Sequence, residues 1–204
     1  LPKSLTAACG VDALTHCIEA YTVQLHQPIT DALALKGISM IAENLEKAYE
    51  NGEDREARRN MMIASTIGGM AFISSNVGAV HAFAETVGAW FDTPHGVANS
   101  LFLPYIMEFN IPACPERFAD IADAMGIERE ESMSDEQYAL KAVEYVKALN
   151  RKLNIPTIKE IKGITEERFE AIAERSANNV LSNDNARKIT KEDYLELLKK
   201  AYNE

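Results

Sequence analysis

Two short stretches decide how this chain is interpreted: GVDALTHCIE at residues 10–19 and VHAFAETVGAWFDTPHG at residues 80–96. The first places a carboxylate and an imidazole four residues apart, so both lie on the same face of a helix. One carboxylate and three imidazoles suit a borderline cation such as Fe(II) or Zn(II) better than Mg(II) or Ca(II), which prefer oxygen ligands. The pattern predicts one divalent metal site and a metal enzyme. The candidate ligands are Asp12, His16, His81 and His95.

The pair Asp12 and His16 has a simpler interpretation when taken alone. An ion pair one helical turn apart stabilises a helix by about 0.2–0.5 kcal/mol and needs no metal. The second stretch, which carries two of the chain's four histidines, favours the metal. Cys17 adjoins His16 and could add a thiolate ligand, but a neighbouring residue on a helix points about 100° away. We therefore expect Cys17 to pack in the core.

Helical patterns dominate the chain, and no long alternating pattern indicates a β-strand. We predict one all-α domain over residues 1–204, with a central first half and a second half that partly covers it. Thr30 is the expected N-cap of the second helix, the Gly68-Gly69 pair should admit a close neighbour, and residues 93–96 should form a turn. Ser134 and Thr190 begin sequences that resemble capping boxes. Helices are predicted at residues 5–23, from the cap at Thr30 to a stop at residues 51–52, and at 54–72, 81–91, 97–109, 115–125, 134–153, 165–178 and 190–202.

The composition excludes several classes of protein. With 31 acidic and 21 basic residues the formal net charge is -10, which argues against nucleic acid as the main partner. No apolar run approaches the roughly 20 residues that span a bilayer. The three cysteines are odd in number and lack metal or disulfide spacing, which favours a reducing cytoplasm.

The sequences GVDALTHCIEAY and HAFAETVGAWFDTPHGVANSLFLP resemble the iron-containing (group III) alcohol dehydrogenases. Members of that family join an N-terminal nucleotide-binding α/β domain to a C-terminal, all-helical metal domain. The resemblance covers the whole chain and implies the C-terminal domain alone, with a fold like that of dehydroquinate synthase. The start at Leu1 without an initiator Met, and the lack of a Gly-rich phosphate loop after a strand, predict that the nucleotide-binding domain is absent from this chain.

Carried over residue by residue, the resemblance puts the four iron ligands of the family on Asp12, His16, His81 and His95. Related zinc enzymes such as glycerol dehydrogenases are usually described with three protein ligands, so four favour Fe(II), with Zn(II) as the alternative. Two further positions are implied for the alcohol pocket. They are Phe72, which matches an aromatic lining residue, and Leu181, which stands where some members carry Cys.

The chain departs from the family at Glu85, four residues after His81. Many members have a histidine there, thought to relay a proton or to contact the nicotinamide. A carboxylate at this position could still act as a catalytic proton relay. Alternatively, it could orient a ligand imidazole from the second shell around the metal. It could equally be a solvated helix residue.

The resemblance implies NAD(P)-dependent interconversion of primary alcohols and aldehydes. The metal would act as a Lewis acid on the substrate oxygen, and NAD or NADP would bind through the missing domain. The resemblance also allows a homo-oligomer. The alternatives are a zinc-dependent glycerol dehydrogenase, a relative of dehydroquinate synthase, and a non-catalytic helical domain stabilised by metal. An anionic substrate of the synthase type would call for Lys or Arg in the two metal stretches, and neither has any.

Overall fold

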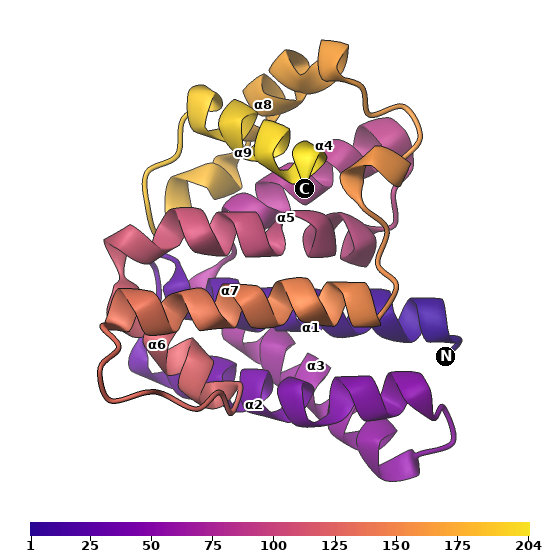
Figure 1. Ribbon diagram of the computed structural model, residues 1–204, viewed down its shortest axis with the longest axis vertical. Coiled ribbons are helices and arrows are strands. Elements are labelled where there is room, and N and C mark those ends of the chain that lie inside the picture. The colour runs from indigo at the N-terminus through magenta and orange to yellow at the C-terminus, as the bar shows by residue number, and fades with distance from the viewer.

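A computed structural model describes residues 1–204 as an assembly of helices without a strand (Figure 1). The prediction of an all-α fold is therefore confirmed. The α-helices are α1 (Lys3–Thr22), α2 (Pro28–Glu50), α3 (Arg55–Ser75), α4 (Ala79–Phe91), α5 (His95–Asn110), α6 (Pro115–Ala124), α7 (Asp135–Lys152), α8 (Phe169–Ala177) and α9 (Lys191–Asn203). The 3-10 helices, which were not predicted as separate elements, are η1 (Ile111–Ala113), η2 (Ile158–Glu160), η3 (Glu166–Arg168) and η4 (Val180–Asp184).

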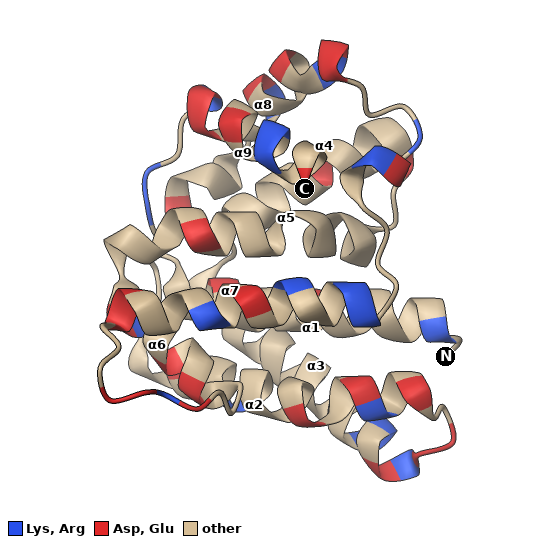
Figure 2. Ribbon diagram, in the orientation of Figure 1, with Lys and Arg blue, Asp and Glu red and all other residues tan.

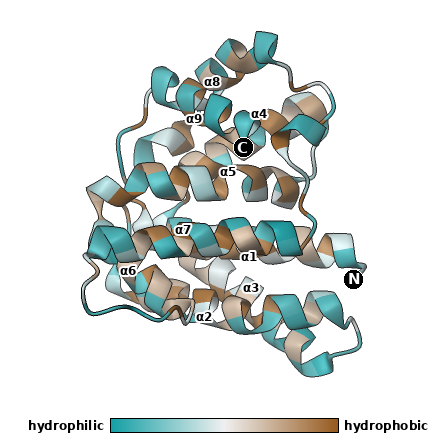
Figure 3. Cartoon of the chain, in the orientation of Figure 1, coloured by the Kyte–Doolittle hydropathy of each residue, from teal (hydrophilic) through white to brown (hydrophobic).

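Helix α1 lies at the centre of the molecule and packs against α2, α3 and α5. Helix α5 in turn packs against α4, α7 and α9, so the two layers visible in Figure 1 meet along α1 and α5. Val11, Leu14 and Ile18 of α1 are almost fully buried. Brown residues along α1 and α5 contrast with the teal outer faces of α7 and α8 in Figure 3. The first candidate stretch thus belongs to a core helix.

Side-chain caps mark the starts of three α-helices, and the cap predicted for a fourth lies elsewhere. Asp54, Ser134 and Thr190 each accept a hydrogen bond from a backbone N–H of the helix that follows, and both predicted capping boxes are present. The prediction of Thr30 as the N-cap of α2 is wrong, because that position is occupied by Gln27. Pro28 takes the first helical position, which suits a residue without an N–H, and so moves the cap three residues upstream.

The turn predicted at residues 93–96 is shorter than expected. Helix α4 ends at Asp92, whose φ of 51° is left-handed, and α5 already begins at His95. Only Thr93 and Pro94 follow Asp92 before that helix starts. This places His95 on the first turn of a helix rather than in a loop.

The Gly68-Gly69 pair of α3 shows two different environments. A Cβ on Gly68 would lie 3.1 Å from Cys17 Sγ, so this residue permits the expected close approach to α1. Gly69 has open space around it, and the expectation fails there. Helix α3 packs on α1 and α2 with one face only, which leaves Met70 and Ile73 exposed.

Charged residues gather on the outer faces of α7, α8 and α9 and around the end of α2 and the start of α3 (Figure 2). Helices α4 and α5 carry few charged residues. No single helix has both the length and the apolar character needed to cross a membrane. Only α3 and α4 together meet both criteria, and they are bent by 106° to one another.

Candidate metal centre

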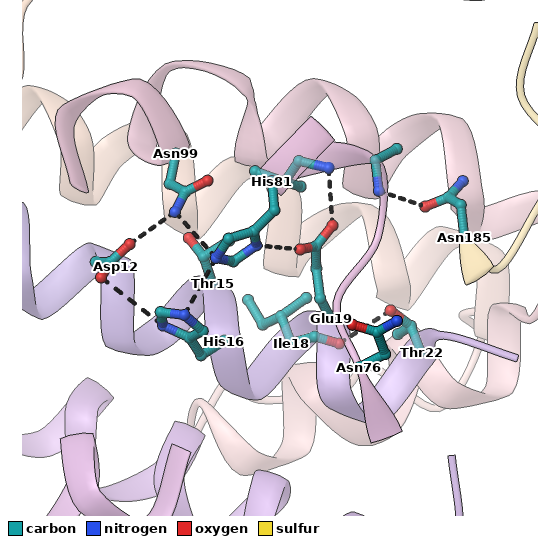
Figure 4. Close-up of polar contacts among 12 residues, drawn as sticks. Asp12, Thr15, His16, Ile18, Glu19, Thr22, Asn76, His81, Asn99 and Asn185 are labelled. Carbon is teal, nitrogen blue, oxygen red and sulfur yellow. Dashed lines mark hydrogen bonds and ion pairs between the residues drawn. The ribbon is translucent and has the colours of Figure 1, made fainter. Parts of the chain in front are cut away.

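Three helices bring the four candidate ligands to one place (Figure 4). Helix α1 contributes a carboxylate and an imidazole one turn apart, α4 a buried imidazole in its first turn, and α5 an imidazole at its first residue. Their ligand atoms all lie within 4.8 Å of one another. The cluster consists of Asp12, His16, His81 and His95.

The spacing of these atoms suits a single metal ion. The Nε2 atoms of His16 and His81 are 3.1 Å apart, and His95 Nε2 lies 3.7 Å from Asp12 Oδ1. Ligand atoms about 2.0–2.2 Å from a common ion would lie about 3 Å from one another. Two ring nitrogens that face each other at 3.1 Å also need a proton or a cation between them, because both carry lone pairs. The donor set therefore fits a borderline divalent metal.

Glu19 fixes the orientation of His81 and was not identified from the sequence as part of the site. Its Oε2 lies 2.5 Å from His81 Nδ1, and its Oε1 accepts a hydrogen bond of 2.8 Å from the backbone N–H of Val80. Proton donation from Nδ1 to the carboxylate leaves the Nε2 lone pair directed at the cluster. A sequence signal existed, because Glu19 follows His16 by three residues on the ligand-bearing face of α1.

Asn99 is a second residue that the sequence analysis missed. It is fully buried in α5, one turn after His95. Its Nδ2 donates a 2.7 Å hydrogen bond to Asp12 Oδ1 and lies 3.2 Å from His81 Nε2 and 3.1 Å from His95 Nε2. Asn99 thus links the carboxylate of α1 to the imidazoles of α4 and α5.

The pKa values of the two inner imidazoles shift in opposite directions, although burial disfavours the charged form of both. Burial, together with the nearby His81 ring, lowers the pKa of His16. Burial also opposes a charge on His81, but the hydrogen bond and negative charge of Glu19 outweigh it and raise the pKa of His81. Only His81 has a buried carboxylate in direct contact with its ring. The lowered pKa favours the neutral form of His16, whose ring nitrogen has a lone pair available for a metal ion.

The cluster is closed on one side and open on the other. The side chain of His81 is 5% exposed, whereas that of His95 is 49% exposed. The start of α5 approaches α1 very closely, because a Cβ on Gly96 would lie 2.4 Å from the carbonyl oxygen of Ala8. Only glycine permits that approach, which brings His95 next to Asp12.

Phe72 and Cys17 are two neighbours of His16 with different environments. Phe72 of α3 is half-buried and stacks on the His16 ring, with centroids 4.5 Å apart. Cys17 is fully buried, and its Sγ packs near Gly37 and Gly68. It does not belong to the cluster of metal-binding atoms, so its prediction as a core residue is confirmed.

The remaining two predicted site residues lie near one another but outside the cluster. Glu85 is exposed on α4, one turn after His81, and its Oε2 accepts a 2.7 Å hydrogen bond from Asn179 Nδ2. Asn179 Oδ1 in turn accepts from the backbone N–H of Leu181, which is half-buried in η4. Glu85 and Asn179 line a cavity of about 560 Å³ between α4 and α8, together with Trp90.

The fold and the cluster define an all-helical domain with a three-histidine, one-carboxylate site. The family model described as Fe-containing alcohol dehydrogenase family, C-terminal, matches residues 6–202. The chain belongs to this family and corresponds to its C-terminal part.

Known relatives agree with this assignment. The chain is 43% identical over 205 residues to alcohol dehydrogenase 4 of Saccharomyces cerevisiae, covering 99% of this chain and 52% of the yeast protein. It is 40% identical over 201 residues to 1,3-propanediol dehydrogenase of Citrobacter freundii, with coverages of 98% and 52%. The chain thus spans about half the length of the relatives it matches.

Solved structures show the same fold. A crystal structure of 1,3-propanediol oxidoreductase superposes with a TM-score of 0.95 at 39% identity, over 98% of this chain and 52% of the other. The alcohol dehydrogenase from Oenococcus oeni gives a TM-score of 0.95 at 40% identity, with coverages of 99% and 52%. The helical arrangement is therefore that of the corresponding halves of these proteins.

Proposed function

We propose that this chain is the metal-binding catalytic part of an NAD(P)-dependent alcohol dehydrogenase that interconverts primary alcohols and aldehydes. The cluster of four ligand atoms within 4.8 Å is the observation that carries this proposal. Relatives support the reaction class, since one is named an NADPH-dependent butanol dehydrogenase and another an NAD-dependent methanol dehydrogenase. Those two names differ in their cofactor, so the proposal includes either NAD or NADP.

The proposed metal is Fe(II), with Zn(II) as the alternative, held by Asp12, His16, His81 and His95. When bound, the ion supplies a Lewis acid that polarises the substrate's oxygen. Glu19 keeps the lone pair of His81 directed at the ion through its 2.5 Å contact with Nδ1. Anomalous scattering at the iron and zinc edges of a metal-loaded crystal would identify the ion.

Substrate binding and proton transfer are assigned to residues outside the cluster of four ligands. We assign Phe72, which stacks on His16, and Leu181 in η4 to the walls around the substrate's carbon atoms. Glu85 would pass the hydroxyl proton to solvent, with its carboxylate oriented by the 2.7 Å hydrogen bond from Asn179. The exposure of Glu85 is compatible with such a relay.

The nicotinamide cofactor would be held by an N-terminal nucleotide-binding domain. The relatives are about twice as long as this chain, which supports a second domain of similar size. We place the complete protein in the cytoplasm, since all three cysteines are free thiols.

The competing functions fit the site less well. A synthase of the dehydroquinate type, with its anionic substrate, would need cationic side chains at the metal, and none of the hydrogen bonds or ion pairs of the four ligands involves Lys or Arg. A purely structural metal site is normally closed, whereas the His95 side chain is 49% exposed. The geometry therefore favours a catalytic role over a structural one.

Fusion to a nucleotide-binding domain tests the function directly. The 204-residue chain alone should show no nicotinamide-dependent oxidation of a primary alcohol, because it has no loop for the pyrophosphate. Appending the N-terminal half of a family member and loading Fe(II) should create that activity. The same fusion with Asp12→Ala is the control and should be inactive. Activity of the chain alone would contradict the domain assignment, and a folded, metal-loaded but inactive fusion would contradict the function.

A further inference from the structure

A short segment far from the ligands in sequence contacts the ends of the ligand-bearing helices. Residues 184–187, from the last residue of η4 toward α9, form this segment, which we call the tether. Asp184 accepts a 2.9 Å backbone hydrogen bond from Gln24, just after α1, and Gln24 Nε2 donates to the carbonyl oxygen of Asn185 at 2.8 Å. Asn76, in the loop before α4, donates from Nδ2 to Asp184 Oδ2 at 2.6 Å. The tether therefore joins the end of α1 to the entrance of α4, and Figure 4 shows the contact of Asn185 with the start of α4.

Asn185 is the most constrained residue of the tether. It is 2% exposed, and both ends of its amide are fully used. Its Oδ1 accepts from the backbone N–H of Ala79 at 3.3 Å and from Asn110 Nδ2 at 3.0 Å. Its Nδ2 donates to Asn110 Oδ1 at 2.7 Å and to the carbonyl oxygen of Arg187 at 2.8 Å. A buried polar group with every partner satisfied holds its neighbours in one arrangement.

These contacts bear on the first turn of α4, from which His81 projects. The first backbone N–H groups of a helix have no partner within the helix. Asn185 accepts from Ala79, and Glu19 accepts from the next residue, Val80. Two side chains from different parts of the sequence thus fix the position of this turn. A Cβ on Gly78 would lie 3.0 Å from Asn185 Oδ1 and 3.2 Å from Glu19 Oε1, so the approach is tight.

We propose that the tether, through Asn185 and through the hydrogen bond between Asp184 and Asn76, positions the metal site. It holds the start of α4, and through it the imidazole of His81, at the correct position relative to Asp12 and His16 on α1. The proposal rests on the proposed function, because it assumes that the cluster binds a metal. Ligand positions must be held to about 0.5 Å for productive geometry, and supporting hydrogen bonds provide that precision.

The backbone at Asn76 supports this role independently. Its φ of 72° and ψ of -173° belong to a region that residues other than glycine rarely adopt. Such strain persists only where the surroundings enforce it, and it clusters at functional sites. Here the hydrogen bond from Asn76 to Asp184 holds the strained loop immediately before the helix that carries His81.

Cobalt binding to the 204-residue chain tests the proposal. Asn185→Leu preserves size but removes all four hydrogen bonds of the amide, and it should weaken Co(II) affinity by about tenfold or more and change the visible d–d spectrum of the bound ion. The matched control is Tyr138→Phe, which removes the hydrogen bonds from the Tyr138 hydroxyl of α7 to Asp123 Oδ1 and to the carbonyl oxygen of Ile127. This control should lower the melting temperature and leave affinity and spectrum unchanged. Wild-type affinity and spectrum in Asn185→Leu would overturn the proposal.

A second variant keeps the test decisive if Asn185→Leu does not fold. Asn76→Gly relieves the unusual φ and removes only the hydrogen bond to Asp184, so it should fold well. It should weaken Co(II) binding by a smaller factor and shift the d–d spectrum. An unchanged affinity and spectrum in this variant would overturn the proposal. If the unmodified chain binds no Co(II), the proposed function itself fails. That outcome is distinct from the one that overturns only this inference, in which the variants bind Co(II) as well as the unmodified chain does.

Discussion

His81 and His95 face the same point, with ring centroids 5.3 Å apart, but their surroundings differ. His81 is buried, and the carboxylate of Glu19 holds its Nδ1. His95 is half exposed, and apart from the other ligands only Asn99 lies within hydrogen-bonding distance of its ring. Under the proposed function, the closed side of the site would fix the geometry of the ligands, and the open side would leave room for a substrate. Variants on the two sides should therefore fail in different ways.

The largest difference is expected between His81→Ala and His95→Ala. Both should lose most of their metal affinity, since each removes a proposed ligand. His81→Ala should also destabilise the metal-free chain by about 3–5 kcal/mol, because it leaves the Glu19 carboxylate buried without its partner. His95→Ala should change that stability little, since its side chain is 49% exposed. Calorimetric metal titration and chemical denaturation of the metal-free chain measure the two effects.

Two results would break this comparison. Unchanged metal affinity in His95→Ala would remove His95 from the ligand set. Equal losses of stability in the two variants would show that the contact between Glu19 and His81 does not distinguish the two sides of the site.

On the exposed surface of α4, Glu85→Gln tests the proton relay. In the complete, fused enzyme this change should lower kcat by about 10²-fold or more, the usual contribution of general acid–base catalysis. Metal content should not change, because Glu85 contacts Asn179 rather than a ligand. Measuring kcat and bound metal on the same preparation separates a relay from a supporting role. If the variant has the kcat of the wild-type enzyme, Glu85 is a surface residue without a role in proton transfer.

On the closed side, Glu19→Gln should have the smaller, purely metal-centred effect. A Gln side chain can accept only one of the two hydrogen bonds that Glu19 accepts, from Val80 N–H and from His81. Metal affinity should fall about 10- to 100-fold, as for other residues that orient a ligand. The matched control for metal affinity is Glu85→Gln, which makes the same chemical change at an exposed carboxylate. Equal affinities in the two variants would contradict the role of Glu19.

Much of the fold followed from periodicity and capping, because helix ends depend on local chemistry. The chain encodes α3 with Asp54 as its N-cap, and α7 and α9 with complete capping boxes. The exposed face of α3, with Met70 and Ile73, was not predictable in this way. An apolar residue on a helix indicates burial only if a neighbouring element covers it, and periodicity does not reveal which faces are covered.

The sequence revealed the proposed ligands of the candidate site but not the residues that support them. The four proposed ligands carry chemistry that a motif can reveal, and the fold brings them together. Glu19 and Asn99 are contiguous with that motif, but their roles depend on which atoms they meet across helices. Asn185 gave no local signal at all, since its partner Ala79 lies 106 residues away. Long-range hydrogen bonds of this kind need the folded chain to be recognised.

The contact between Gly96 and α1 has a consequence for laboratory evolution. A side chain at residue 96 would meet the backbone of Ala8 at 2.4 Å, and a backbone carbonyl cannot rotate out of the way. Any replacement there would push α5 away from α1 and carry His95 with it. If Phe72 and Leu181 line the substrate pocket as proposed, a library designed to change substrate range can vary those two residues, while codon 96 must stay fixed.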